Sequence, residues 1–377
     1  MSINLGWKRK SLELLETIAD KFILYFDELS AGDRENYCET IKDTIQKVLL
    51  HPRIFYIDKE SEKNNSLFSI LASENPIEST EILFRAFYSE LHKSLSSWMT
   101  IYPLPRIKSD SYSLVFDGIF LFAPDDKEVW QQLAPNYINA SKWHPAETAD
   151  SKTIWGDVNS NWLICQAHGT VEGTRRLSEK RMRTFIAVLF SFLYELPNLL
   201  DKTSSSVNTY CKQFPSKDSN TGFGEMNVSI GNLLPPMLID VEVSEETLNE
   251  VNEWYRKRAS KNEEFQKRIT TASHFIQYGI VADGLERFIH FFIALDALFG
   301  ERGNVERLIT EGIKRTFPSD EIWEYKISKL FDLRSSLVHG GCSSISEWED
   351  LDVYRRHTKS HPERDVIIAA MTSFKTI

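Results

Sequence analysis

The chain has 377 residues, of which 42% are hydrophobic, 12% aromatic and 26% charged, and its formal net charge is −10. This composition excludes an intrinsically disordered protein and predicts two or three globular domains. Residues 1–250 carry the whole acidic excess, since residues 251–377 hold 19 Lys and Arg and 19 Asp and Glu. Nucleic-acid-binding surfaces are usually basic, so the acidic residues 1–250 are a poor candidate for such a surface. The neutral C-terminal part leaves room for a local basic cleft.

The cysteines form no CxxC pair and have no metal-ligand spacing with histidine, which predicts no metal site and no cofactor. They are Cys38, Cys165, Cys211 and Cys342. The first residues lack the apolar segment of a signal peptide. The longest apolar run, in residues 185–194, is about ten residues long and too short to span a bilayer. These features predict a soluble, cytoplasmic protein that does not contact a membrane.

Residues 1–240 are expected to form a mixed α/β region with a sensing or regulatory role. Its first part, residues 1–105, is predicted to be helical, because residues 8–50 and 78–100 repeat apolar side chains at three- and four-residue steps. Its second part, residues 106–240, is predicted to contain strands.

Two segments of this second part are rich in β-branched and aromatic residues and predict strands, namely residues 111–124 and 161–173. A buried helix is expected over residues 175–196, and a loop-rich connector over residues 202–236. The helix begins with the arginines Arg175, Arg176, Arg181 and Arg183. We interpret them as a solvated helix face rather than a phosphate-binding patch.

Residues 241–377 predict a bundle of four or five helices, so the fold class is mainly α. Ser244 and the two acids that follow it are typical of a helix start, and this helix is expected to end near Ala259. Gly312 lies on an apolar stripe, where it would allow close helix packing. The further helices are expected over residues 263–279, 284–300, 305–317 and 320–339, the last one stopped by Gly340 and Gly341, and from Glu363 onward.

Two of these helices carry a charge where the pattern requires an apolar residue. Arg334 belongs to the stripe of Trp323, Ile327, Leu330 and Leu337, and Asp296 belongs to the face of Phe288, Phe292 and Phe299. A buried charge is costly unless it is paired or lines a cleft. Arg334 and Asp296 therefore form either a structural ion pair or part of a functional site.

Arg334 and His339 form an Arg-x4-His motif at a helix end before Gly-Gly. The segment Leu-Arg-Ser-Ser-Leu-Val-His-Gly and the upstream helix Phe-Phe-Ile-Ala-Leu-Asp-Ala-Leu-Phe resemble the HEPN superfamily of ribonucleases, and particularly its Apea-like branch, over residues 245–377. The resemblance implies a metal-independent RNA endonuclease. In this reaction the 2′-hydroxyl attacks the adjacent phosphodiester and leaves a 2′,3′-cyclic phosphate and a 5′-hydroxyl.

The resemblance also implies the residue roles. His339 would be the general acid or base, and Arg334 would hold the phosphate. Asp296 and Ser335 would support them, although Ser335 stands where many family members carry Asn, Asp or His. Arg334 and His339 point about 140° apart on an ideal helix, so one chain makes a poor site and a homodimer is expected.

The partners implied are an RNA substrate, such as tRNA or mRNA, and a regulatory partner or trigger acting at residues 1–240. The biological role implied is that of a toxin or an antiviral defence effector. The alternative function is a non-catalytic HEPN module that binds a nucleotide or a protein partner. The acidic net charge favours this alternative, whereas the presence of both Arg334 and His339 favours the nuclease.

Two other groups of residues offer weaker candidates. Arg355 and His361 also match the loose Arg–His spacing, and we interpret them as part of a surface loop before Pro362. Cys342 lies three residues after His339 and would suit a Cys/His hydrolase. However, no activating base or oxyanion loop accompanies it.

Overall fold

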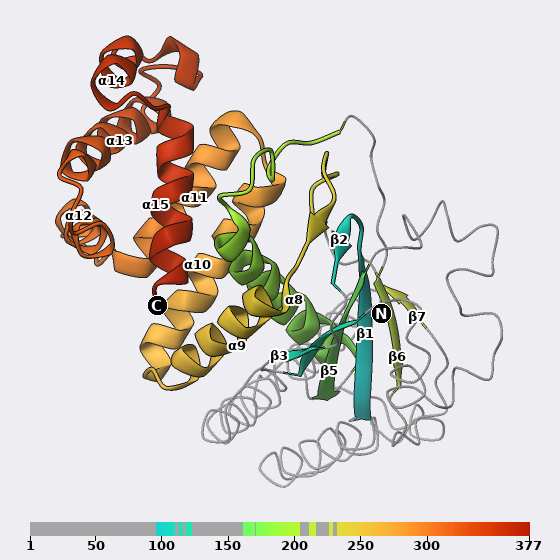
Figure 1. Ribbon diagram of the computed structural model, residues 1–377. Coiled ribbons are helices and arrows are strands. Elements are labelled where there is room, and N and C mark those ends of the chain that lie inside the picture. The colour runs from blue at the N-terminus through green and yellow to red at the C-terminus, as the bar shows by residue number, and fades with distance from the viewer. Residues whose placement is uncertain are drawn as a thin grey trace, which may run out of the picture. The chain divides into compact units, whose positions relative to one another are not determined.

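The computed structural model describes residues 96–109, 113–115, 118–122, 161–169, 171–203, 211–215, 226–228 and 232–377. This part of the protein is mainly helical and contains a small sheet (Figure 1). The chain divides into unit 1 (Met1–Met99, Gln166–Ser178 and Phe214–Glu225) and unit 2 (Thr100–Cys165, Glu179–Gln213 and Met226–Ile377). The core and the sites discussed below belong to unit 2. The helices expected over residues 8–50 and 78–95 lie outside the described residues.

Six strands form one sheet in the order β3-β4-β5-β1-β6-β7, and β2 pairs with β8 in parallel. Their bounds are β1 (Ser96–Leu104), β2 (Ile107–Lys108), β3 (Ser113–Val115), β4 (Ile119–Phe122), β5 (Asn161–Gly169), β6 (Cys211–Pro215), β7 (Met226–Val228) and β8 (Val241–Glu242). The strand predicted over residues 161–173 is confirmed as β5. The single strand predicted over 111–124 is an antiparallel pair, β3 and β4.

The structure corrects two predictions in this region. The stretch 96–104, expected to be helical, is strand β1, whose Trp98, Met99, Ile101 and Tyr102 are all fully buried. A short continuous apolar run fits a strand covered on both faces as well as a buried helix, so its periodicity misled the prediction. The connector expected over residues 202–236 contains the antiparallel strands β6 and β7.

The helices carry the rest of the described structure. Their bounds are α8 (Val171–Leu193), α9 (Glu245–Ala259), α10 (Glu263–Val281), α11 (Gly284–Phe299), α12 (Val305–Thr316), α13 (Ile322–Val338), α14 (Leu351–Thr358) and α15 (Pro362–Lys375), with a short 3₁₀ helix, η2 (Ile345–Glu347), before α14. The predicted buried helix over 175–196 is confirmed as α8. Five predicted C-terminal helices and the last one from Glu363 are likewise confirmed.

Local signals explain these boundaries. The Ser244 hydroxyl accepts a hydrogen bond from the Thr247 amide at the start of α9. At the end of α13, Gly340 adopts a left-handed φ of 78° and the Gly341 amide donates to the Ser336 carbonyl at 2.7 Å. A Cβ added to Gly312 would stand 2.5 Å from the Phe299 ring, so this glycine does allow the close packing of α12 on α11.

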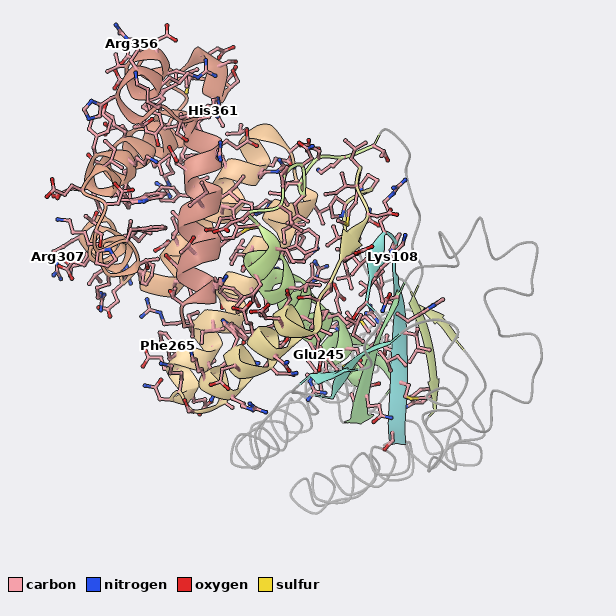
Figure 2. All side chains as sticks on the ribbon, viewed as in Figure 1. Lys108, Glu245, Phe265, Arg307, Arg356 and His361 are labelled. Atoms are coloured by element: carbon pink, nitrogen blue, oxygen red, sulfur yellow. The ribbon has the colours of Figure 1, made fainter. Side chains whose placement is uncertain are left out.

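Helix α14 was not predicted. Arg355, which we expected in a surface loop, lies on α14, whereas His361 directly precedes α15. Figure 2 shows the neighbouring Arg356 on α14 and His361 at the start of α15. The helix is only eight residues long and ends at Lys359, which has a positive φ of 54°. Its pattern is mostly polar, so periodicity alone gives little sign of it.

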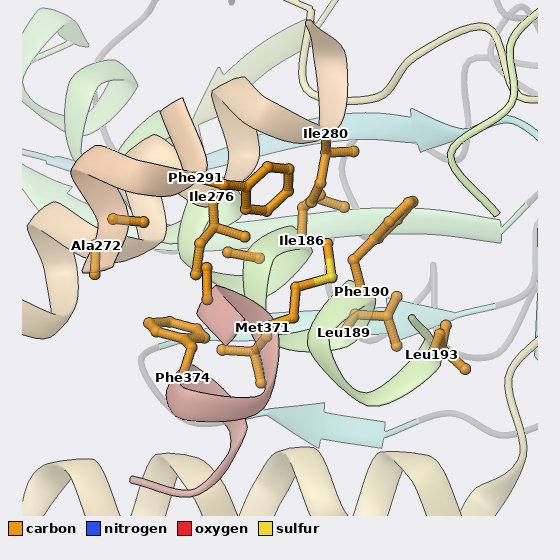
Figure 3. Close-up of a cluster of buried hydrophobic side chains, with 14 of the residues drawn as sticks. Ile186, Leu189, Phe190, Leu193, Ala272, Ile276, Ile280, Phe291, Met371 and Phe374 are labelled. Atoms are coloured by element: carbon orange, nitrogen blue, oxygen red, sulfur yellow. The ribbon is translucent and has the colours of Figure 1, made fainter. Parts of the chain in front are cut away.

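The core of unit 2 joins α8 to the C-terminal helices. Figure 3 shows the contact, in which side chains of α8 meet those of α10, α11 and α15. The α8 residues in this view are Ile186, Leu189, Phe190 and Leu193, and they face Ile276, Ile280, Phe291, Met371 and Phe374. The boundary expected at residue 240 differs from the observed division of the chain, because α8 helps to form the core of the C-terminal helices.

Candidate functional site

The buried face of α13 ends one turn before the helix does. It consists of Trp323, Lys326, Ile327, Leu330 and Leu333. Arg334 continues this stripe by helical spacing but is exposed, and Leu337 is half-buried. This exposure contradicts the alternative in which Arg334 is one half of a buried structural ion pair.

The path of α13 along α15 gives the physical reason. Lys326, in the first half of α13, binds Asp365 in the first turn of α15. Leu333 is the last buried residue of α13. Arg334, about two turns after Lys326, therefore lies beyond the buried part of the helix.

Four exposed residues form what we call the α13 end surface: Arg334, Ser335, Val338 and His339. Val338 is 52% exposed. His339 is the residue at which α13 stops, and its backbone amide still donates to the Ser335 carbonyl at 2.9 Å. The motif residues thus lie within the last two turns of α13.

The polar side chains of this surface are not engaged within the described part of the chain. Neither the Arg334 guanidinium nor the His339 ring has an ion pair or hydrogen bond with another described side chain. The nearest acid in sequence, Asp332, is bound by Lys329 at 3.1 Å. Lys329 also binds Asp350 on the other side at 2.8 Å, and these bonds raise the pKa of its ammonium group. Arg334 and His339 are therefore available to an external ligand.

Asp296 lies elsewhere. It is half-buried and lines a groove of about 480 Å³ between α10 and α11, to which α13 contributes no residue. Arg268, on the same groove, donates to the carbonyls of Ala297 and Gly300 at the end of α11. A Cβ on Gly300 would stand 1.8 Å from the Asp296 carboxylate. Neither the ion pair expected between Arg334 and Asp296 nor any described contact between them is formed.

The charge that α13 does bury is Lys326. Its side chain is 11% exposed, and its ammonium group donates to Asp365, which is 1% exposed, at 2.9 Å. Asp365 also accepts hydrogen bonds from the Tyr354 hydroxyl at 2.6 Å and the Ser360 hydroxyl at 2.9 Å. Burial and the Asp365 charge raise the pKa of Tyr354. One carboxylate thereby ties α13, α14 and α15 together.

The sequence contains an indication of this network, because both charged residues stand on apolar helix faces. Asp365 shares a face of α15 with Val366, Ala369 and Ala370, at the three- and four-residue spacing of a buried stripe. Lys326 follows Trp323 by three residues and lies 4.6 Å from its ring centroid. Each side chain interrupts an apolar face, as Arg334 and Asp296 do by helical spacing.

Arg183 is a second buried charge, and it corrects the prediction of a solvated arginine face on α8. Its side chain is 6% exposed and binds Glu179 at 2.7 Å. It also donates to the Gln277 side chain of α10. A buried arginine with these partners is a structural element of the α8–α10 contact and is closed to a phosphate.

The weaker candidates remain separate from the α13 end surface. Arg355 is exposed on α14. His361 is half-buried, and burial followed by the Arg355 charge lowers the pKa of its imidazole. Burial and the charge of Glu347 raise the pKa of the Cys342 thiol, which disfavours the thiolate that a nucleophilic cysteine requires.

Within the described ranges, no three His, Cys, Asp or Glu side chains gather into a group that could hold a metal ion. No described helix combines the length and the apolar character needed to cross a membrane. Comparisons of the chain with family models, with curated proteins and with solved structures find no match.

Proposed function

We propose that this protein is a metal-independent RNA endonuclease of the HEPN type, acting through Arg334 and His339. The observation that carries the proposal is the exposure of both side chains at one end of α13, without partners among the described residues.

The chemistry follows from the two side chains. A neutral histidine accepts the proton of the ribose 2′-hydroxyl, and the oxygen attacks the adjacent phosphorus. The bond from phosphorus to the 5′-oxygen breaks, and this oxygen takes a proton from a protonated histidine. Arg334 donates to the non-bridging oxygens, whose negative charge increases during the step. The products are a 2′,3′-cyclic phosphate and a 5′-hydroxyl.

The proposed active species is a homodimer joined at the α13 end surface. Val338 follows Arg334 by four residues on α13 and is 52% exposed. A second copy of the chain would cover this side chain. A twofold axis through this surface would place two Arg334 and two His339 side chains around one phosphate. Asp296 lines a different groove, so its supporting role rests on the family resemblance alone.

The test is cleavage of total tRNA and of an mRNA by the purified full-length chain, with and without excess EDTA. We expect cleavage in both conditions and 3′ ends that carry cyclic phosphate. Arg334→Ala and His339→Ala should each abolish cleavage, and Arg334→Lys should retain little, because lysine lacks the planar fork of donors.

Arg355→Ala is the matched control, since Arg355 is also an exposed helical arginine, six residues before His361. It should cleave like the wild type. Products with a 5′-phosphate, loss of activity with EDTA, or full activity in Arg334→Ala would each refute the proposal. RNA or nucleotide binding that depends on Arg334, without cleavage, would favour the non-catalytic module.

A further inference from the structure

A cluster of rings lies where α8, α10 and α11 meet, apart from the residues proposed for catalysis. We call it the ring cluster; it consists of Arg183, His274, Phe275, Tyr278 and His290. The His290 ring stacks on Tyr278, with centroids 5.4 Å apart and planes at 23°, and on Phe275, with centroids 6.1 Å apart and planes at 28°. His274 meets the Tyr278 ring edge-on at 4.5 Å.

The ring cluster also attaches α8. The Arg183 guanidinium lies 4.8 Å from the centroid of Tyr278 and binds Gln277, the residue before it. One residue further along α8, the Thr184 hydroxyl lies 2.9 Å from the hydroxyl of Ser273 on α10. The polar contacts of α8 with α10 are therefore concentrated next to the two histidines.

His290 is badly placed to carry a charge. Its Nδ1 atom is buried and has no hydrogen-bond partner among the described groups. A protonated imidazole donates from both nitrogens, so the additional N–H would be buried without an acceptor, which is costly. Burial lowers the pKa of His290, while the Glu286 charge on α11 opposes this.

His274 lies in the same surroundings, at the exposed rim of the cluster. Partial burial against its neighbours is the first cause that lowers its pKa, followed by the charge of Arg183 on α8. His290 on α11 also lowers this pKa, and Glu179 on α8 raises it. A proton on His274 would add a second positive charge beside the guanidinium that holds α8. Both histidines thus resist protonation in the folded state.

We propose that the ring cluster is an acid-sensitive joint, which loosens α8 from α10 and α11 when His274 and His290 take up protons. A histidine whose folded pKa lies below its unfolded value, about 6.5, stabilises the folded state above that pH and loses this contribution as the pH falls. The contact of α8 with α10 and α11 is therefore intact at neutral pH and becomes progressively less stable below about pH 6.5. This inference is independent of the proposed nuclease activity.

Hydrogen–deuterium exchange of the full-length chain at pH 7.5 and 5.5, corrected for intrinsic rates, tests the joint. We expect opening of residues 179–193 and 269–281 to increase at pH 5.5, by at most about tenfold for each histidine, because pH 5.5 lies one unit below the ordinary histidine pKa of about 6.5. In His274→Gln/His290→Phe, whose phenylalanine keeps the ring stack, the increase should disappear. His357→Gln, at an exposed histidine of α14, is the control and should behave like the wild type.

His274→Gln alone provides a second variant, since His274 is exposed and its loss should leave the fold intact. It should remove part of the pH dependence. Equal opening of wild-type α8 at both pH values would overturn the proposal. So would an unchanged increase in folded His274→Gln, or in the double variant.

Discussion

Substitution of Lys326 by methionine should destabilise the protein strongly. Methionine keeps much of the length of the side chain next to Trp323 but leaves the Asp365 carboxylate, 1% exposed, without its cation. Loss of one partner of a buried ion pair costs about 3–5 kcal/mol. Tyr354 and Ser360 still donate to Asp365, so the lower end, about 3 kcal/mol, is expected.

Chemical denaturation in urea, monitored by circular dichroism, measures this loss as a lower midpoint. The double variant Lys326→Met/Asp365→Leu should regain much of the stability, because no unpaired charge remains buried. Arg356→Ala, an exposed change on α14, is the control and should lie within about 0.5 kcal/mol of the wild type. A cost below about 1 kcal/mol for Lys326→Met, or a double variant less stable than the single one, would refute the role assigned to this pair.

Three further predictions concern other parts of unit 2. Arg334→Ala and His339→Ala should each change the free energy of unfolding by less than about 0.5 kcal/mol, because both side chains are exposed; a larger loss in thermal denaturation would contradict that exposure. Gly312→Ala should cost about 1–3 kcal/mol in the same assay, since its Cβ would stand 2.5 Å from the Phe299 ring, and an unchanged midpoint would argue against this close packing. Tyr354 should not ionise in an alkaline absorbance titration while the protein stays folded, because burial and Asp365 raise its pKa; its titration near pH 10, at the ordinary tyrosine value, would show that the hydroxyl is solvated.

Local signals were sufficient to predict the C-terminal helices other than α14. Ser244 and Gly340 act through bonds to residues within one turn, so their effect is readable without knowing the fold. Arg334 shows the limit of the same reasoning. Helical spacing tells which face a residue occupies, but it does not tell how far along the helix the neighbouring elements cover that face, and on α13 full burial ends before Arg334.

Buried charges are harder to predict, because their partners are distant in sequence. Asp365 lies 39 residues after Lys326, and Gln277 lies 94 residues after Arg183. Glu179 lies four residues before Arg183 and binds it, but nothing near either cation in the sequence indicates the distant partners Gln277 and Asp365. The sequence could therefore predict helix α13 and its end, but neither the exposure of Arg334 nor the buried networks that fix the helices.

The place of α8 limits how such a protein can be rearranged in evolution. Because α8 forms one wall of the core that α10, α11 and α15 share, a gene fusion that joined residues 241–377 to a new partner would leave those apolar side chains without cover. A recombination point before α8 would transfer α8 together with the C-terminal helices. A recombination point at residue 240 would leave α8 behind. Exchange of the C-terminal helices between proteins is thus expected to include α8, so the exchanged segment would be longer than the Arg334–His339 motif alone requires.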